Sequence, residues 1–191
     1  MLARTLSPTA ISLAPITHSG VRVAAGVLFF AGLTAVGAMV RVPLPFTPVP
    51  MTLQTLSVLL AGIALGPNLG VCSQALYLLV GLCGVPVFAG VEAGPTFVFG
   101  STAGYLAGFL LAPFVVGHLT SRQCATGRLF LATSVGMLTV FVLGVAWLAV
   151  ILHSLEDALR LGLLPFLPAA AVKLALAGLI GRGVLSLTRR F

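Results

Sequence analysis

The chain has 191 residues, of which 59% are hydrophobic and 7% are charged, and its net charge is +7. Soluble domains carry about 25% charged residues, so this composition excludes a soluble protein and predicts an all-α integral membrane protein. Its arginines cluster at the ends of apolar segments, which indicates membrane orientation and contact with anionic membrane lipid. We therefore expect no nucleic-acid binding.

Six apolar segments follow an N-terminal stretch that is interrupted by Pro8 and Pro15. Residues 1–19 are expected to be a cytoplasmic tail, and residues 20–191 a single six-helix transmembrane domain. A helix needs about 20 residues to cross a bilayer. The helices are expected at residues 21–40, 51–65, 68–83, 97–118, 128–153 and 165–187.

The connection between the first two helices contains four prolines within residues 42–50. Proline lacks a backbone N–H and is excluded from helix interiors. In lipid, irregular backbone is tolerated only against protein or a water-filled cavity. The segment is therefore interpreted as the wall or lid of a binding site, with an ordinary interhelical turn as the alternative.

All three acidic residues of the chain lie in two connections. One connection joins the third and fourth segments, and the other joins the fifth and sixth. With six spans, seven arginines share the side of both termini, and only Arg41 and Arg160 lie opposite. This bias predicts that both termini are cytoplasmic. The proline-rich connection and residues 88–95 and 156–165 are then external loops.

Lys173 is the only lysine, and it lies inside the sixth apolar segment. Ionisable residues within membrane spans are expected to be functional. If the helix begins near Pro165, Lys173 lies about 12 Å along it at about 1.5 Å per residue. A cation at this depth suits an anionic ligand group such as a carboxylate, whereas snorkelling to the headgroups is the alternative.

Other polar residues lie at a similar depth in the outer half of the predicted bundle. Thr52 and Gln54 begin the second helix, and Tyr105 lies near the start of the fourth. Gln54 offers a donor and an acceptor together, which suits an amide or a urea-like group. Each residue could instead make an interhelical hydrogen bond.

Three further residues are candidates for ligand binding. Phe88 and Gly90 lie in the segment 85–90, which mixes apolar surface with glycine and proline and could close over an apolar ligand body. Tyr77 shares a face of the third helix with Gln74 and is more typical of packing.

The first helix contains small residues four positions apart, Ala31 and Ala35. Small residues at this spacing let membrane helices approach closely. A partner membrane protein could dock there, and internal packing is the alternative.

No enzyme motif is present. The sequence has no paired intramembrane carboxylates, no HExxH and no GxSxG, so we expect no catalytic residues. The cysteines have no metal-binding spacing, and no metal site is expected. No ATPase motif occurs, so the chain cannot itself use ATP, and no cofactor is expected.

An ordered set of motifs resembles the bacterial biotin transporter family, the substrate-binding (S) components of energy-coupling-factor (ECF) transporters. The resemblance runs collinearly from the first helix to the last, through Pro48-Val49-Pro50-Met51-Thr52-Leu53-Gln54-Thr55, Leu65-Gly66-Pro67, Tyr77-Leu78-Leu79-Val80-Gly81, Gly84-Val85-Pro86-Val87-Phe88-Ala89-Gly90, Gly100-Ser101-Thr102-Ala103-Gly104-Tyr105 and Pro165-Phe166-Leu167-Pro168 with Lys173.

The resemblance implies a six-transmembrane-helix bundle of the ECF S-component type that binds biotin with high affinity near its outer face. It also implies a bacterial plasma membrane location, and a transmembrane coupling subunit with a pair of ATPases as partners. The coupling subunit would dock on the small-residue face of the first helix. ATP would be used by the partners only, and biotin would be the transported ligand.

The sequence departs from the family pattern in the sixth helix, and also at the start of the fourth, where Ser101 and Ala103 stand in place of a frequent proline and glycine. The family pattern in the sixth helix is Pro-Gly-Asp-x-x-Lys, and Ala169 and Ala170 stand here in place of the glycine and aspartate. An S component for a different vitamin therefore stays open as an alternative. A structural membrane subunit without transport activity is the second alternative.

Overall fold

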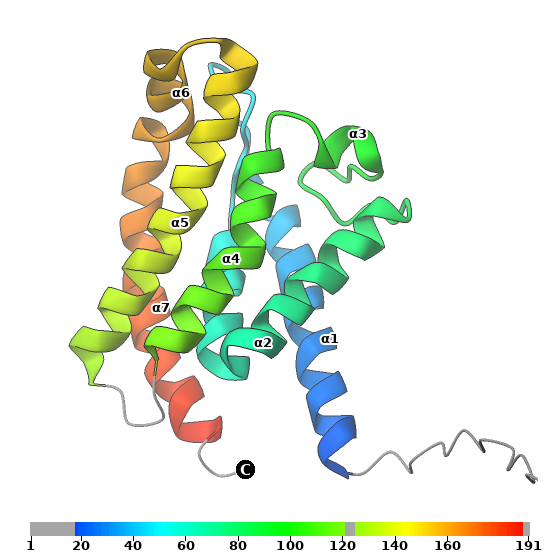
Figure 1. Cartoon of the computed structure of the whole chain (residues 1–191), viewed down its shortest axis with the longest axis vertical. Coiled ribbons are helices and arrows are strands. Elements are labelled where there is room, and N and C mark those ends of the chain that lie inside the picture. The colour runs from blue at the N-terminus through cyan, green and yellow to red at the C-terminus, as the bar shows by residue number, and fades with distance from the viewer. Residues whose placement is uncertain (1–17, 121–124, 189–191) are drawn as a thin grey trace, which may run out of the picture.

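Long apolar runs form helices here because every backbone polar group in lipid must be bonded within the chain. The computed structural model describes residues 18–120 and 125–188, and its long helices run side by side in a bundle (Figure 1). These helices are α1 (His18–Met39), α2 (Gln54–Leu82), α4 (Ala103–Leu119), α5 (Thr126–Leu152) and α7 (Leu167–Thr188). The predicted N-terminal tail, residues 1–19, lies outside the described residues except for His18 and Ser19, which begin α1.

Helix α2 consists of two halves that meet at a sharp kink. Gly66 has φ 77° and ψ −174°, a conformation that is almost exclusive to glycine, and Pro67 follows it. The chain reverses direction there, so the two halves run as separate helices (Figure 1). Counted in this way, the described residues form six helices along the bundle, which confirms the predicted fold.

The helices have the length and composition of membrane spans. Four stretches within the described ranges are long and apolar enough to cross a bilayer, namely Gly20–Met39, Gln54–Leu82, Thr126–Leu152 and Leu155–Leu185. The helix Ala103–Leu119 is apolar but shorter.

Helix α4 packs closely against α5 through glycines. A Cβ atom on Gly104 would lie 2.2 Å from the carbonyl oxygen of Leu143, and one on Gly108 would lie 2.7 Å from the Cα atom of Val140. Such small residues allow two membrane helices to approach at backbone distance. This contact fixes the wall on which Tyr105 lies.

The proline-rich connection forms a small hairpin, so the predicted helix start at residue 51 is wrong. Strands β1 (Arg41–Val42) and β2 (Met51–Thr52) pair antiparallel, and α2 begins only at Gln54. The N–H of Leu53 bonds the carbonyl oxygens of Gly37 and Val40, which holds this turn against the end of α1 and delays the helix.

The predicted helix 97–118 is interrupted near its start. Residues Pro95–Val98 form a single short helix, α3, and α4 begins at Ala103. Gly100 donates its N–H to Phe97 and accepts from Ala103, so the backbone turns between the two helices.

The predicted loop 156–165 is helical instead. Helix α6 (Leu155–Gly162) and the 3₁₀ helix η1 (Leu164–Phe166) lead into α7. Ser154 caps α6 by accepting the N–H of Asp157 at 3.2 Å, and this Ser-x-x-Asp pattern is a helix-start signal in the sequence. Figure 1 shows α6 lying across one end of the bundle.

The start of α1 and the end of α7 lie together at the other end of the bundle (Figure 1). Arg22, Arg128 and Arg182 belong to helix ends on that side, whereas Arg41 and Arg160 belong to β1 and α6. We call the end that carries α6 the outer end, after the side that the arginine bias predicts to be external.

Candidate functional site

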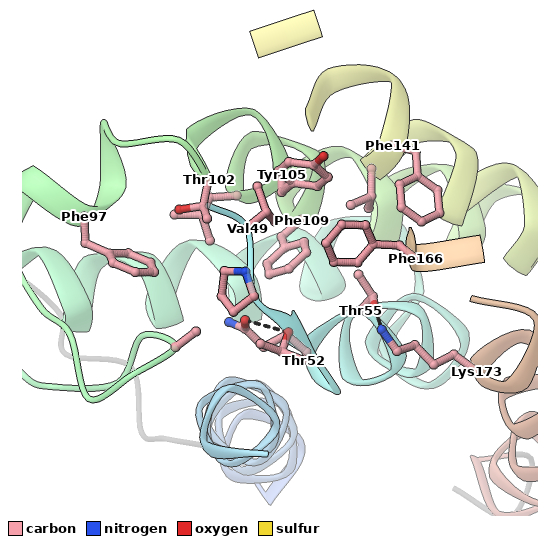
Figure 2. A pocket seen from close by; sticks show the side chains of 15 residues that line it. Val49, Thr52, Thr55, Phe97, Thr102, Tyr105, Phe109, Phe141, Phe166 and Lys173 are labelled. Atoms are coloured by element: carbon pink, nitrogen blue, oxygen red, sulfur yellow. Dashed lines mark hydrogen bonds between the residues drawn. The ribbon is translucent and has the colours of Figure 1, made fainter. Parts of the chain in front are cut away.

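A cavity lies near the outer end of the bundle. Its volume is about 60 Å³, which is room for only a few water molecules at about 10–15 Å³ each. The bundle helices supply most of its wall, and the proline-rich connection, the loop before α3 and η1 cover it (Figure 2). The lining includes Val49, Pro50, Thr52, Gln54, Thr55, Phe97, Tyr105, Phe109, Val140, Phe141, Phe166 and Lys173.

Lys173 brings a buried cation to this cavity. It is 8% exposed, and its Nζ atom donates a hydrogen bond of 2.9 Å to the hydroxyl of Thr55 (Figure 2). Among the described residues, the ion pair joins Glu156 and Arg160 on the surface of α6. No carboxylate of the described residues therefore pairs with Lys173. A buried cation without a counter-charge attracts an anionic group.

Gln54 is held in a chain of hydrogen bonds at the start of α2. Its Oε1 atom accepts from the hydroxyl of Thr52 at 3.0 Å (Figure 2), and its Nε2 atom donates to the hydroxyl of Tyr77 at 2.6 Å. Tyr77 in turn donates to the carbonyl oxygen of Val87 at 3.3 Å. Gln54 is therefore a preorganised polar group beside the cavity.

Tyr105 contributes a ring to the cavity, whereas its hydroxyl has a structural partner. The hydroxyl donates to the carbonyl oxygen of Gly162 at 2.7 Å, at the end of α6. A Cβ atom on Gly144 would lie 2.3 Å from the ring, so a glycine at this position is needed to make room for the ring of Tyr105.

Aromatic rings support the wall from behind. Phe97 lines the cavity, and the ring of Phe88 stacks on it with centroids 4.9 Å apart. Tyr77 meets Phe88 edge-on at 5.5 Å. Phe88 is fully buried and its ring lies over Gly81, where a Cβ atom would collide with it.

Four of the residues predicted for ligand binding line the cavity together: Lys173, Gln54, Thr52 and Tyr105. Phe88 and Tyr77 lie one layer behind the wall, and Gly90 packs against the side chain of Arg41 instead.

Four apolar lining residues on the bundle helices and η1 were not predicted from the sequence. Phe109, Val140, Phe141 and Phe166 lie in uniformly apolar stretches. Such residues carry no sequence signal that separates a ligand wall from ordinary core packing.

Ala31 and Ala35 line a different hollow. They face an apolar groove of about 250 Å³ between α1 and the second half of α2, together with Leu76 and Val80. Ala31 is buried and belongs to the main core cluster. These positions therefore pack internally and also border an open apolar groove.

The described residues contain no group of three His, Cys, Asp or Glu side chains that could hold a metal ion. The cavity instead combines one cation, an amide, three threonine side chains and aromatic walls. This set suits a small amphipathic anion that also carries hydrogen-bonding groups.

Comparisons with known proteins identify close relatives. The model of the BioY family matches residues 8–190. A probable biotin transporter BioY of Pyrococcus horikoshii is 39% identical over 155 residues, which cover 81% of this chain and 90% of that protein. The biotin transporter BioY of Thermotoga maritima is 36% identical over 151 residues, covering 79% and 88%.

A solved structure has the same fold. The crystal structure of the S-component for biotin from an ECF-type ABC transporter matches with a TM-score of 0.81 and 26% sequence identity. The match covers 92% of this chain and 95% of that one.

Proposed function

This chain belongs to the BioY family, and from that membership we infer that it is a biotin-binding S component of an ECF-type transporter that serves biotin uptake. It is a multi-pass membrane protein and a transport protein rather than an enzyme. The family resemblance read from the ordered motifs is confirmed.

The observation that carries the ligand assignment is the buried Lys173 without a carboxylate partner among the described residues. Biotin has a carboxylate on an apolar chain and a ureido group on a thioether ring. We propose that Lys173 binds the carboxylate and that Gln54 with Thr52 binds the ureido group. Tyr105, with neighbouring phenylalanines, would pack the apolar body between them.

The size of the cavity implies that its cover moves. About 60 Å³ holds a few waters, which is less than a molecule of biotin needs. We propose that the proline-rich connection and η1 separate from each other to admit the ligand.

We propose the remaining assembly from the ECF context of the family. A transmembrane coupling subunit would dock along α1 near Ala31 and Ala35, and its two ATPases would use ATP, so this chain itself needs no cofactor. The bundle would lie in a bacterial plasma membrane, in contact with lipid, with both termini cytoplasmic.

One observation favours a different vitamin as a second candidate. Ala170 is 6% exposed and lies one turn before Lys173, so this face of α7 lacks the carboxylate of the family pattern. The purely structural subunit has no comparable support.

Uptake in a bacterial strain that lacks biotin synthesis and its own biotin transporter tests the function. Cells that express this chain should accumulate radiolabelled biotin and grow on low external biotin, and unlabelled biotin should compete. Lys173→Met should abolish this uptake, whereas the surface variant Arg160→Gln should not. This test requires normal membrane expression of the chain and the presence of its family's coupling subunit. Under these conditions, accumulation no greater than in cells without the chain would refute biotin uptake.

A further inference from the structure

Gln54 can offer the cavity either its carbonyl oxygen or its NH₂ group, and the two faces recognise opposite ligand groups. Its neighbours decide between them. Gln54 is 5% exposed, so its amide group has protein partners on the sides that do not face the cavity.

The direction of the hydrogen bonds begins at Val87. A backbone carbonyl only accepts, so the single hydroxyl hydrogen of Tyr77 is donated to the oxygen of Val87 at 3.3 Å. The oxygen of Tyr77 is then an acceptor toward Gln54, whose Nε2 atom lies 2.6 Å away. The amide oxygen of Gln54 consequently points to the hydroxyl of Thr52 at 3.0 Å.

The reversed amide satisfies fewer groups. Tyr77 would have to give its hydrogen to Gln54, and the carbonyl oxygen of Val87 would lose that donor. Three hydrogen bonds would become two, and buried polar groups are rarely left unpaired.

We propose that Tyr77 is a positioning residue, which fixes the Gln54 amide so that its carbonyl oxygen accepts one N–H of the ligand. A carbonyl oxygen accepts two hydrogen bonds, and Thr52 provides one, so a single acceptor site remains. This inference rests on the proposed function, in which that N–H belongs to the ureido group of biotin. It gives Tyr77, which does not line the cavity, a role in selectivity.

This positioning role also explains why Tyr77 and Phe88 pack behind the cavity wall. Tyr77 is 2% exposed and packs edge-on against Phe88, so its hydroxyl has little freedom to turn. The same hydroxyl ties the start of α2 to the loop that contains Val87.

The test compares biotin with the two cyclic carbamates in which a ring oxygen replaces one or the other ureido N–H. Wild-type protein should bind at least one carbamate tenfold more weakly than biotin, because the acceptor on Gln54 loses its donor. In Tyr77→Phe this ratio should shrink at least threefold, because the amide is free to turn. A purely structural role of Tyr77 would weaken all three ligands alike.

The matched control is Thr34→Val, which removes the hydroxyl that donates to Gln74 at 3.2 Å, a buried polar pair between α1 and α2. Its carbamate ratio should equal that of wild type. A ratio in Tyr77→Phe equal to that of wild type, or carbamates that both bind wild type as tightly as biotin, would overturn the proposal.

A ligand-free readout separates this inference from the biotin assignment. The chain has three glutamines, Gln54, Gln74 and Gln123, so glutamine side-chain ¹⁵N labelling gives three amide proton pairs. Tyr77→Phe should move the pair that is missing in Gln54→Met. An unmoved pair would overturn the positioning role, whereas a moved pair in a protein that binds no biotin would refute the ligand only.

Discussion

A lysine within a membrane span is unfavourable unless an interaction compensates its charge. Its cost is about 2.5–3.5 kcal/mol on insertion scales, and the neutral hydroxyl of Thr55 at 2.9 Å leaves that charge in place. Lys173 is also the only lysine of the chain. We propose that a ligand carboxylate supplies the missing negative charge.

Lys173 should therefore select for the charge of the ligand. Wild-type protein should prefer biotin to its neutral amide, biotinamide, by at least tenfold, or about 1.4 kcal/mol, when each competes with labelled biotin. Lys173→Met keeps most of the length of the side chain but removes the charge, and it should reduce the preference to less than threefold. A preference that persists in this variant would show that another group binds the carboxylate.

Depth along the helices was sufficient to predict that three polar residues lie at one level, but not that Thr55 and Thr102 join them. Gln54, Tyr105 and Lys173 were each expected near the outer end, and they line one cavity. The sequence could not separate Phe88 from Phe97, because the direction of each ring depends on the turns around α3. Only the fold shows that Phe97 lines the cavity and that Phe88 supports it.

At the scale of elements, glycine and proline determine where helices end, and their signals are local. The break at Gly66-Pro67 was therefore predictable. The β1–β2 hairpin was not, because it depends on the bonds of Leu53 to the end of α1. Helix α6 was missed although Ser154 and Asp157 form a recognisable cap.

Replacing Gly66 should destabilise the bundle. No atom lies within 4 Å of a Cβ at this position, so Gly66→Ala adds backbone strain without a collision, at φ 77°. We expect a loss of about 1–3 kcal/mol, seen as a lower melting temperature in detergent. The matched control is Gly178→Ala in α7, where a Cβ atom would also have open space; this variant should not melt at a lower temperature than wild type. A Gly66→Ala protein as stable as wild type would contradict the role of Gly66 in forming the kink.

The side chain of Thr47 joins the proline-rich connection to the end of α6. The hydroxyl of Thr47 donates to the carbonyl oxygen of Leu161 at 2.8 Å, which links the proline-rich connection to the segment that precedes η1. If these segments separate to release biotin, Thr47→Val should speed dissociation about fivefold, which corresponds to a hydrogen bond of about 1 kcal/mol.

A chase of bound labelled biotin measures this rate. Thr139→Val is the control, because the hydroxyl of Thr139 bonds within α5 at 2.9 Å and should leave dissociation unchanged. An unchanged rate in Thr47→Val would mean that the ligand leaves by another route.

At the scale of the whole molecule, the proposed orientation places the outer end outside the cell. Cys83 is exposed at the end of α2. With Cys72 and Cys124 replaced by serine, intact cells should react with a membrane-impermeant maleimide at Cys83. In a cysteine-free chain, Thr126→Cys at the start of α5 should react only after permeabilisation, and the reverse pattern would invert the orientation.

We propose that this six-helix bundle holds biotin at its outer end through a buried cation, Lys173. The most direct test is calorimetric titration of biotin into the purified chain in detergent, beside Lys173→Met and the surface control Arg160→Gln. The account predicts saturable binding by wild type and Arg160→Gln, and binding at least tenfold weaker by Lys173→Met. Equal affinities in all three proteins, or no binding by folded wild-type protein, would contradict it.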